Sequence, residues 1–308
     1  MIKIERSNLS NILKTHVKNV IKYIPIGIFS GKDQRYLEKN LFDILSATPD
    51  QFDKYIKETK SMPKSKVKAA FVGSQKSSWR KAGNYTGYNH FSSKGTTPYN
   101  AYHLSKSLKV NVCPYCNKNY TYTVINKKNK IVRPQFDHFI SKEKYPILAL
   151  SFYNLIPSCS DCNASIKGRK EFGLDTHLHP YVDDFNAIKE FSTKGTLLSL
   201  VTKKSEFEII FETREDVLSE LEKKADKVIE DFALREVYSK HKDIVLELLD
   251  KSRAYNDASI DNIKKDTKIF KEKEDILRLI TCGYMEDEKL DQRPLSKLIK
   301  DIYEKLES

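Results

Sequence analysis

The sequence has no run of about 18 apolar residues, the length that a transmembrane helix requires. Residues 1–6 also lack the apolar segment of a secretion signal. Internal repeats and low-complexity tracts are absent as well. We therefore expect a soluble, cytoplasmic protein with no membrane partner. Its hydrophobic content of 39% is sufficient to build a buried core.

A nucleotide-binding loop is also missing. Residues 27–33 show some likeness to a phosphate-binding loop, but three residues rather than four separate Gly27 from Gly31. Asp33 stands where a serine or threonine would bind Mg²⁺. We therefore reject this segment as a nucleotide site.

Acidic residues are too few to balance the basic ones. The chain has 54 Lys and Arg against 42 Asp and Glu, which gives a net charge of +12. A surplus of this sign favours polyanionic partners, and nucleic acid comes first among them. A lysine-rich, solvated surface would give the same charge, so charge alone leaves both interpretations open.

The N-terminal region, residues 1–104, is predicted to be mainly helical. Apolar residues recur at helical spacing over residues 8–24 and 33–46. Thr48 and Pro49 then mark a further helix start, since they combine a threonine N-cap with proline at the first helical position.

Glycine and proline punctuate residues 73–100, which predicts a long loop. Cations and aromatic residues alternate along it: Lys76, Trp79, Arg80, Lys81, Tyr85, Tyr88, His90, Lys94 and Tyr99. Such a mixture suits a nucleic-acid surface, because cations meet phosphates and rings stack on bases. Alternatively, the loop packs its aromatic residues on the domain below it, and the sequence leaves both interpretations open.

Two β-hairpins are expected further along the chain, at residues 120–136 and 196–212, where apolar and polar residues alternate. Helical spacing returns from Arg214 onward. We therefore predict an α+β protein with a small β-containing centre at residues 105–185. Mainly helical regions flank this centre, and the C-terminal one, residues 186–308, also carries the second hairpin.

Cysteine is scarce, with five residues, but four of them form two Cys-x-x-Cys pairs, Cys113/Cys116 and Cys159/Cys162. Disulfides are not expected in a cytosolic chain of this size, and paired spacing points to a metal. Four thiolates form a closed tetrahedral cage for Zn²⁺ with no open position, so this zinc is predicted to be structural. Cys282 is interpreted as an ordinary semi-buried thiol.

Polar residues typical of a reactive site lie around the second cysteine pair. Asp137 and His138 lie on a predicted strand between the two pairs, Asn154 precedes Leu-Ile-Pro, and Asn163 directly follows Cys162. Over about residues 110–170, this order resembles the HNH endonucleases of the ββα-metal, or His-Me finger, class. The resemblance implies a treble-clef-like zinc module that hydrolyses phosphodiester bonds of nucleic acid.

The resemblance also assigns roles to these residues. His138 matches the family's general base, since a neutral imidazole accepts a proton from water. Asp137 and the side-chain carbonyl of Asn163 would bind one catalytic Mg²⁺ or Mn²⁺, a hard cation that prefers oxygen ligands. Asn154 matches a brace that keeps His138 oriented. Asn163 stands where many members carry histidine, whose imidazole would favour softer transition metals.

Each of these residues also has a purely structural interpretation. An Asp-His pair on a strand is usually polar surface, and an asparagine after a cysteine is usually a cap or turn residue. Lys167 would either contact a phosphate or be a solvated helix lysine. His177 and His179 would either line the phosphate path or pack within a turn.

Two other functions remain open at this point. A non-catalytic treble-clef zinc module could bind nucleic acid or protein, although such a binder has no reason to keep Asp137 and His138 together with Asn163. An RNase of the same fold would carry the same motif as the DNase that we favour.

The flanks suggest a subfamily. Residues 145–157, together with His179-Pro180 and the helical flanks, look like the HNH nuclease component of Septu-type bacterial anti-phage defence systems. That resemblance implies an antiviral effector that works with an ATPase partner. A stand-alone restriction-type or mobile-element nuclease is the other interpretation.

Overall fold

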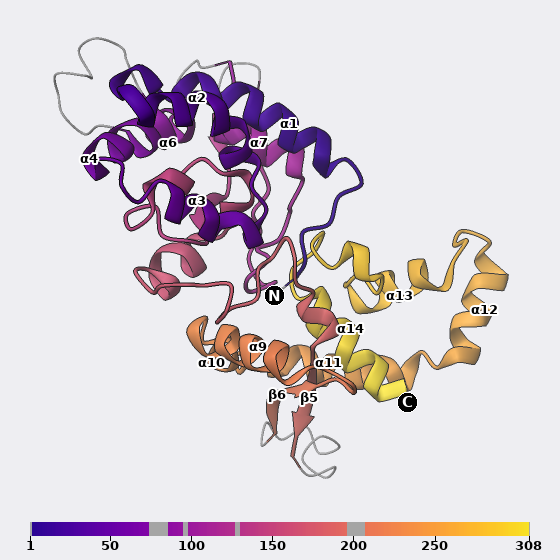
Figure 1. The fold of residues 1–308 in the computed structure, drawn as a ribbon. Coiled ribbons are helices and arrows are strands. Elements are labelled where there is room, and N and C mark those ends of the chain that lie inside the picture. Colours follow the sequence, from indigo (N-terminus) through magenta and orange to yellow (C-terminus); the bar gives the residue numbers. More distant parts are fainter. Residues whose placement is uncertain (1, 74–85, 95–97, 127–129, 196–206, 308) are drawn as a thin grey trace.

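The computed structural model describes residues 2–73, 86–94, 98–126, 130–195 and 207–307. Helices dominate it and the sheets are small, so the α+β class is confirmed. Figure 1 shows the N-terminal helices gathered at one end and the orange-to-yellow C-terminal helices at the other, joined by the central segment. None of the described helices is long and apolar enough to cross a membrane.

The N-terminal helices form where apolar spacing predicts them. They are α1 (Leu9–Val20), α2 (Gly31–Ser46), α3 (Phe52–Glu58), α4 (Lys64–Val67), α6 (Gly87–Ser92) and α7 (Ala101–Leu108). Val17 and Val20 of α1 and Leu37 of α2 are fully buried, as the predicted amphipathic faces require. Thr48 caps a 3-10 turn that leads into α3, and Gln51 completes the capping box, so the predicted helix start is confirmed.

The prediction of one long loop over residues 73–100 is wrong in its second half, because α6 forms there. Gly87, at the start of α6, has φ +59°, and a Cβ at this position would lie 2.5 Å from the Phe71 carbonyl oxygen. Glycine therefore permits the tight approach that lets Phe91 reach the core. Tyr88, Phe91 and Tyr99 pack inward, which favours the packing interpretation; Lys76, Trp79, Arg80, Lys81 and Tyr85 lie outside the described residues.

Three antiparallel strand pairs follow in the part of the chain that the structure describes. They are β1 (Val124–Ile125) with β2 (Lys130–Val132), β3 (Gln135–His138) with β4 (Leu155–Ser158), and β5 (Lys189–Lys194) with β6 (Glu208–Thr213). The hairpin predicted over residues 120–136 is confirmed for β1 and β2, but Gln135 and Phe136 belong to β3. The register of β3 pairs Asp137 with Ile156 and His138 with Leu155.

The second predicted hairpin is confirmed in part. Strand β6 forms within it, but its partner β5 comes earlier in the chain than expected, and residues 197–201 lie outside the described residues. Helices complete this region: α9 (Ser219–Asp231), α10 (Leu234–Tyr238), α11 (Lys242–Ala254), α12 (Asp257–Thr267), α13 (Lys273–Thr281) and α14 (Ser296–Glu307).

One cluster of buried apolar side chains extends from Ile4 to Tyr303. The N-terminal segment contributes directly to the centre, because the Ile2 amide donates to the Pro114 carbonyl at 2.6 Å and the Ile4 amide to that of Pro180 at 2.7 Å. The division at residues 104/105 and 185/186 stays a prediction, since this core includes side chains from all three regions.

Candidate metal centre and catalytic cavity

The first cysteine pair lies in a tight knuckle. The Asn117 amide donates to the Cys113 carbonyl at 2.8 Å, and the Cys113 amide donates to the Asn119 carbonyl at 2.9 Å. Asn117 has φ +47°, a left-handed conformation that asparagine tolerates better than most residues. This turn directs the sulfurs of Cys113 and Cys116 inward.

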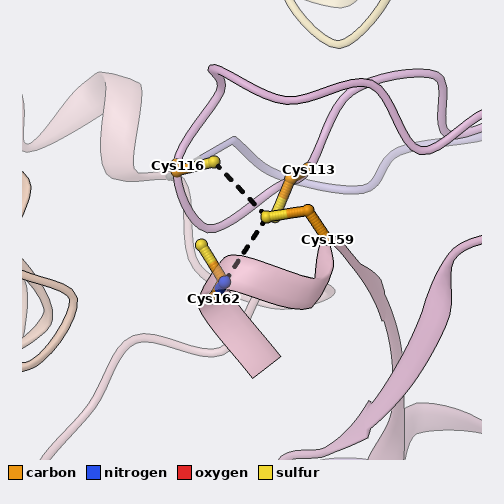
Figure 2. A group of neighbouring side chains, drawn as sticks. All are labelled: Cys113, Cys116, Cys159 and Cys162. Carbon is orange, nitrogen blue, oxygen red and sulfur yellow. Dashed lines mark hydrogen bonds between the residues drawn. The ribbon is translucent and has the colours of Figure 1, made fainter. Parts of the chain in front are cut away.

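The second pair approaches from the opposite side. Cys159 directly follows β4, and Cys162 lies in the π-helix Asp161–Lys167. Figure 2 shows this helix and the first knuckle presenting their side chains to one another. The four buried sulfurs all lie within 4.8 Å of one another, and those of Cys116 and Cys159 are 3.9 Å apart.

These distances fit zinc. A tetrahedral ion with Zn–S bonds of about 2.3 Å requires sulfurs separated by roughly 3.8 Å. Burial raises the pKa of the Cys113 thiol, so a cation is needed to hold this group as a thiolate among three other buried sulfurs. The arrangement of the four cysteines therefore suits a metal ion such as zinc. Cys282 is not part of this group, and it is exposed rather than semi-buried as expected.

A cavity of about 900 Å³ lies beside this centre. Three predicted site residues, Asp137, His138 and Asn163, line it together. Its other walls are Tyr88, Ser92, Arg133, Gln135, Phe136, Phe139, Ser141, Lys142, Glu143, Lys167, Gly168, Arg169 and Lys170. The strand β3 and the π-helix therefore bring residues that are far apart in the sequence to one pocket.

His138 is held in a defined orientation. Its Nε2 lies 2.9 Å from the Ala149 carbonyl oxygen, which can only accept, so Nε2 carries the proton. In the described part of the chain, Nδ1 makes no hydrogen bond and keeps its lone pair. The Tyr88 ring packs edge-on against the imidazole, with the two ring centroids 4.4 Å apart. Burial, reinforced by Lys142, holds the pKa of His138 well below its usual value of 6.5.

Asn154, fully buried, lies behind His138 rather than in the cavity. Its side-chain oxygen accepts from the Ile140 amide at 2.7 Å, and its amide nitrogen donates to the carbonyls of Ile140 and Leu148, each at 3.0 Å. These bonds join the end of β3 to the turn that carries Ala149, the partner of His138. Asn154 therefore holds backbone on both sides of His138 and is not among the residues that line the cavity.

Asp137 is buried and has two donors. Lys167 Nζ contacts both carboxylate oxygens, at 2.9 and 2.7 Å, and the Tyr115 hydroxyl donates to Oδ2 at 2.6 Å. Lys167 also donates to the His138 carbonyl at 2.8 Å. Both predicted roles of Lys167 are therefore corrected: it is neither solvated nor extended toward a phosphate, but forms a buried ion pair.

Asn163 lies near the start of the π-helix, directly beside Gln135, the first residue of β3. Its side-chain nitrogen donates to Gln135 Oε1 at 2.7 Å. The side-chain carbonyl oxygen accepts no hydrogen bond from the described residues, so it is the atom left for a ligand. Asp137 and Asn163 thus offer oxygen atoms to the same cavity, which is the donor chemistry that a hard cation prefers.

His177 and His179 pack in the core. His177 stacks on Phe172 with ring centroids 3.8 Å apart and contacts Asp231 at 2.9 Å. His179 packs on Phe139, and burial lowers its pKa to about 3. Neither histidine is among the residues that line the cavity, so the packing interpretation holds.

Neither Tyr88 nor Tyr115 is identified from the sequence as part of this site. Tyr88 falls in the segment predicted as a loop, because the glycines around α6 are read from the sequence as loop residues rather than as a helix start. Tyr115 lies inside the first cysteine pair, and only its buried position between two metal ligands could have marked it.

No protein-family model matches the chain, and no solved structure does. Two curated proteins show partial similarity. Protein ea31 of Escherichia phage lambda is 34% identical over 73 residues, which are 23% of this chain and 21% of that protein. Septu protein PtuB of Bacillus thuringiensis is 32% identical over 83 residues, 27% of this chain and 29% of that protein. The chain therefore matches less than a third of each relative's length, and its link to a Septu protein is weak but present.

Proposed function

We propose that this protein is an HNH-type endonuclease that hydrolyses phosphodiester bonds, with DNA as its substrate. The observation that carries the proposal is the gathering of Asp137, His138 and Asn163 around one cavity beside a four-cysteine cluster. A zinc module that only binds would not need an unpaired imidazole nitrogen and two oxygen donors at the same pocket.

His138 is the general base in this proposal. Because Nε2 donates to Ala149, the neutral ring has its lone pair on Nδ1, which can take the proton of an attacking water. Tyr88 holds the ring from the side, and Asn154 holds the turn that carries Ala149. These contacts fix the imidazole before substrate arrives, as efficient proton transfer requires.

Asp137 and Asn163 would hold Mg²⁺ or Mn²⁺. Lys167 and Tyr115 together make three hydrogen bonds to the Asp137 carboxylate, which offers about four lone-pair positions. One position on Oδ1 therefore remains for a metal bond. A cation bound there would neutralise charge on the scissile phosphate and on the leaving oxygen.

Two cations of the cavity are suited to the phosphate backbone. Lys142 and Arg169 line it and form no ion pair within the described residues. We expect Lys142→Ala/Arg169→Ala to weaken DNA binding and to reduce the slope of log K against log [salt] by about 0.9 per lost contact. The measurement is a salt titration on a His138→Gln background without added metal.

The control for this titration is Lys264→Ala/Lys265→Ala, which removes the same charge from exposed positions on α12. An unchanged slope in Lys142→Ala/Arg169→Ala, or an equal change in the α12 pair, would show that the cavity does not contact phosphate.

Substrate class is tested by incubating the zinc-loaded protein with plasmid, single-stranded DNA and RNA in Mg²⁺ or Mn²⁺. We expect cleavage of DNA that leaves 5′-phosphate ends. Preferential cleavage of RNA would make the protein an RNase of the same fold. A lack of cleavage on all three would favour the non-catalytic zinc module.

We further propose that this nuclease acts in anti-phage defence together with an ATPase. The partial similarity to Septu protein PtuB supports this role. Co-purification of the tagged protein from its native host, followed by mass spectrometry, tests the partnership. Recovery of a fully active protein without an ATPase would count against it.

A further inference from the structure

Tyr115 joins the cysteine cluster to the carboxylate of the cavity. It lies between Cys113 and Cys116, and its hydroxyl donates to Asp137 Oδ2 at 2.6 Å. We propose that Tyr115 is a positioning residue through which the zinc knuckle sets the geometry of the second metal site. This inference rests on the proposed function, because it requires Asp137 to bind a catalytic cation.

The Tyr115 ring has little freedom to move. It is fully buried, and it stacks on Phe232 with centroids 4.4 Å apart and an interplanar angle of 24°. The cysteines on either side of it would be tied to zinc, so the backbone of this residue is held at both ends. The hydroxyl is therefore presented to Asp137 from a fixed point.

The consequence appears at the carboxylate. The Tyr115 hydroxyl donates to one lone pair of Asp137 Oδ2, and Lys167 Nζ donates to both carboxylate oxygens. Together they determine how the carboxylate plane is turned and leave the open position on Oδ1. Removing the Tyr115 hydroxyl would free Oδ2 without changing the net charge of the pocket. A loss of metal affinity would therefore reflect a changed orientation of the Asp137 carboxylate rather than a changed charge.

The chain offers a matched control in Tyr238. This tyrosine is also buried, and its hydroxyl donates to the Cys116 carbonyl at 2.6 Å. Tyr238→Phe therefore removes one hydroxyl that bonds to the same knuckle but not to Asp137. A general weakening of the knuckle would affect both variants, whereas a positioning role affects Tyr115→Phe alone.

The experiment is a Mn²⁺ titration followed by electron paramagnetic resonance on zinc-loaded wild type, Tyr115→Phe, Tyr238→Phe and Asp137→Asn. We expect one Mn²⁺ site that Asp137→Asn removes. Tyr115→Phe should raise its Kd by about 10–100-fold, the usual cost of losing a partner that orients a metal ligand. Zinc content should stay at one per chain, and Tyr238→Phe should bind Mn²⁺ like the wild type.

Two outcomes overturn the inference alone: a Kd for Tyr115→Phe within twofold of the wild type, or an equal rise in Tyr238→Phe. A wild type with no Mn²⁺ site sensitive to Asp137→Asn would instead contradict the proposed function, and the inference with it. At saturating Mn²⁺, Tyr115→Phe should also recover most of its cleavage rate, which a variant with a damaged fold would not do.

Discussion

Substituting His138 by glutamine is expected to reduce the single-turnover rate of DNA cleavage by about 10²–10⁴-fold, the usual contribution of a general base. Glutamine keeps a side chain that can reach the Ala149 carbonyl, but its amide cannot take a proton from water at neutral pH. The rate is measured with saturating Mg²⁺ and with zinc content and thermal stability recorded alongside.

His16 provides the matched control for this substitution. It is also buried, and its Nε2 lies 2.9 Å from the Leu150 carbonyl oxygen, next to the carbonyl that His138 contacts. It is not part of the cavity lining. His16→Gln should therefore affect stability but leave cleavage within a few-fold of the wild type at temperatures where it is folded. Equal losses in both variants would mean that His138 acts only through packing.

Loss of a single zinc ligand is expected to prevent folding altogether. Binding of structural zinc contributes about 10–16 kcal/mol in small zinc modules, which matches or exceeds the roughly 5–15 kcal/mol by which a whole domain is stable. We expect Cys162→Ser to contain less than one zinc per chain by elemental analysis and to be insoluble or to lack a cooperative melting transition. The same holds for Cys113, Cys116 and Cys159.

Cys282 provides the control, because its substitution also removes a thiol but not one of the four proposed zinc ligands. Cys282 is exposed and outside the cluster, so Cys282→Ser should keep one zinc per chain and the wild-type melting temperature. A soluble Cys162→Ser protein that melts like the wild type, or a well-folded wild type without zinc, would contradict the assignment of the cluster as a structural zinc site.

The four-cysteine cluster could be predicted from the sequence because its signal is local. Two Cys-x-x-Cys pairs define their own knuckles, and each needs only the turn around it. The α+β class and the helices α1 and α2 followed in the same way from apolar spacing. The role of Asn154 as a brace stays a prediction, which its hydrogen bonds to Ile140 and Leu148 support.

The contacts of Lys167 and Tyr88 could not be predicted, since they depend on tertiary packing. Lys167 looks like a surface lysine at the end of a short helix, and only the fold shows that Asp137 lies within its reach. Tyr88 belongs to a helix of six residues that begins at a glycine, which local propensity disfavours. Packing of Phe91 in the core stabilises that helix and places Tyr88 against His138.

The most direct test of the central claim is cleavage of plasmid DNA by zinc-loaded wild type, compared in Mg²⁺ and in EDTA, with His138→Gln run in parallel. Exposure to EDTA is kept brief, and zinc content is measured afterwards to show that the structural site is intact. The account predicts cleavage in Mg²⁺, none in EDTA with zinc still bound, and at most about 1% of the wild-type rate in His138→Gln. Undiminished cleavage in EDTA, or full activity in His138→Gln, would contradict it.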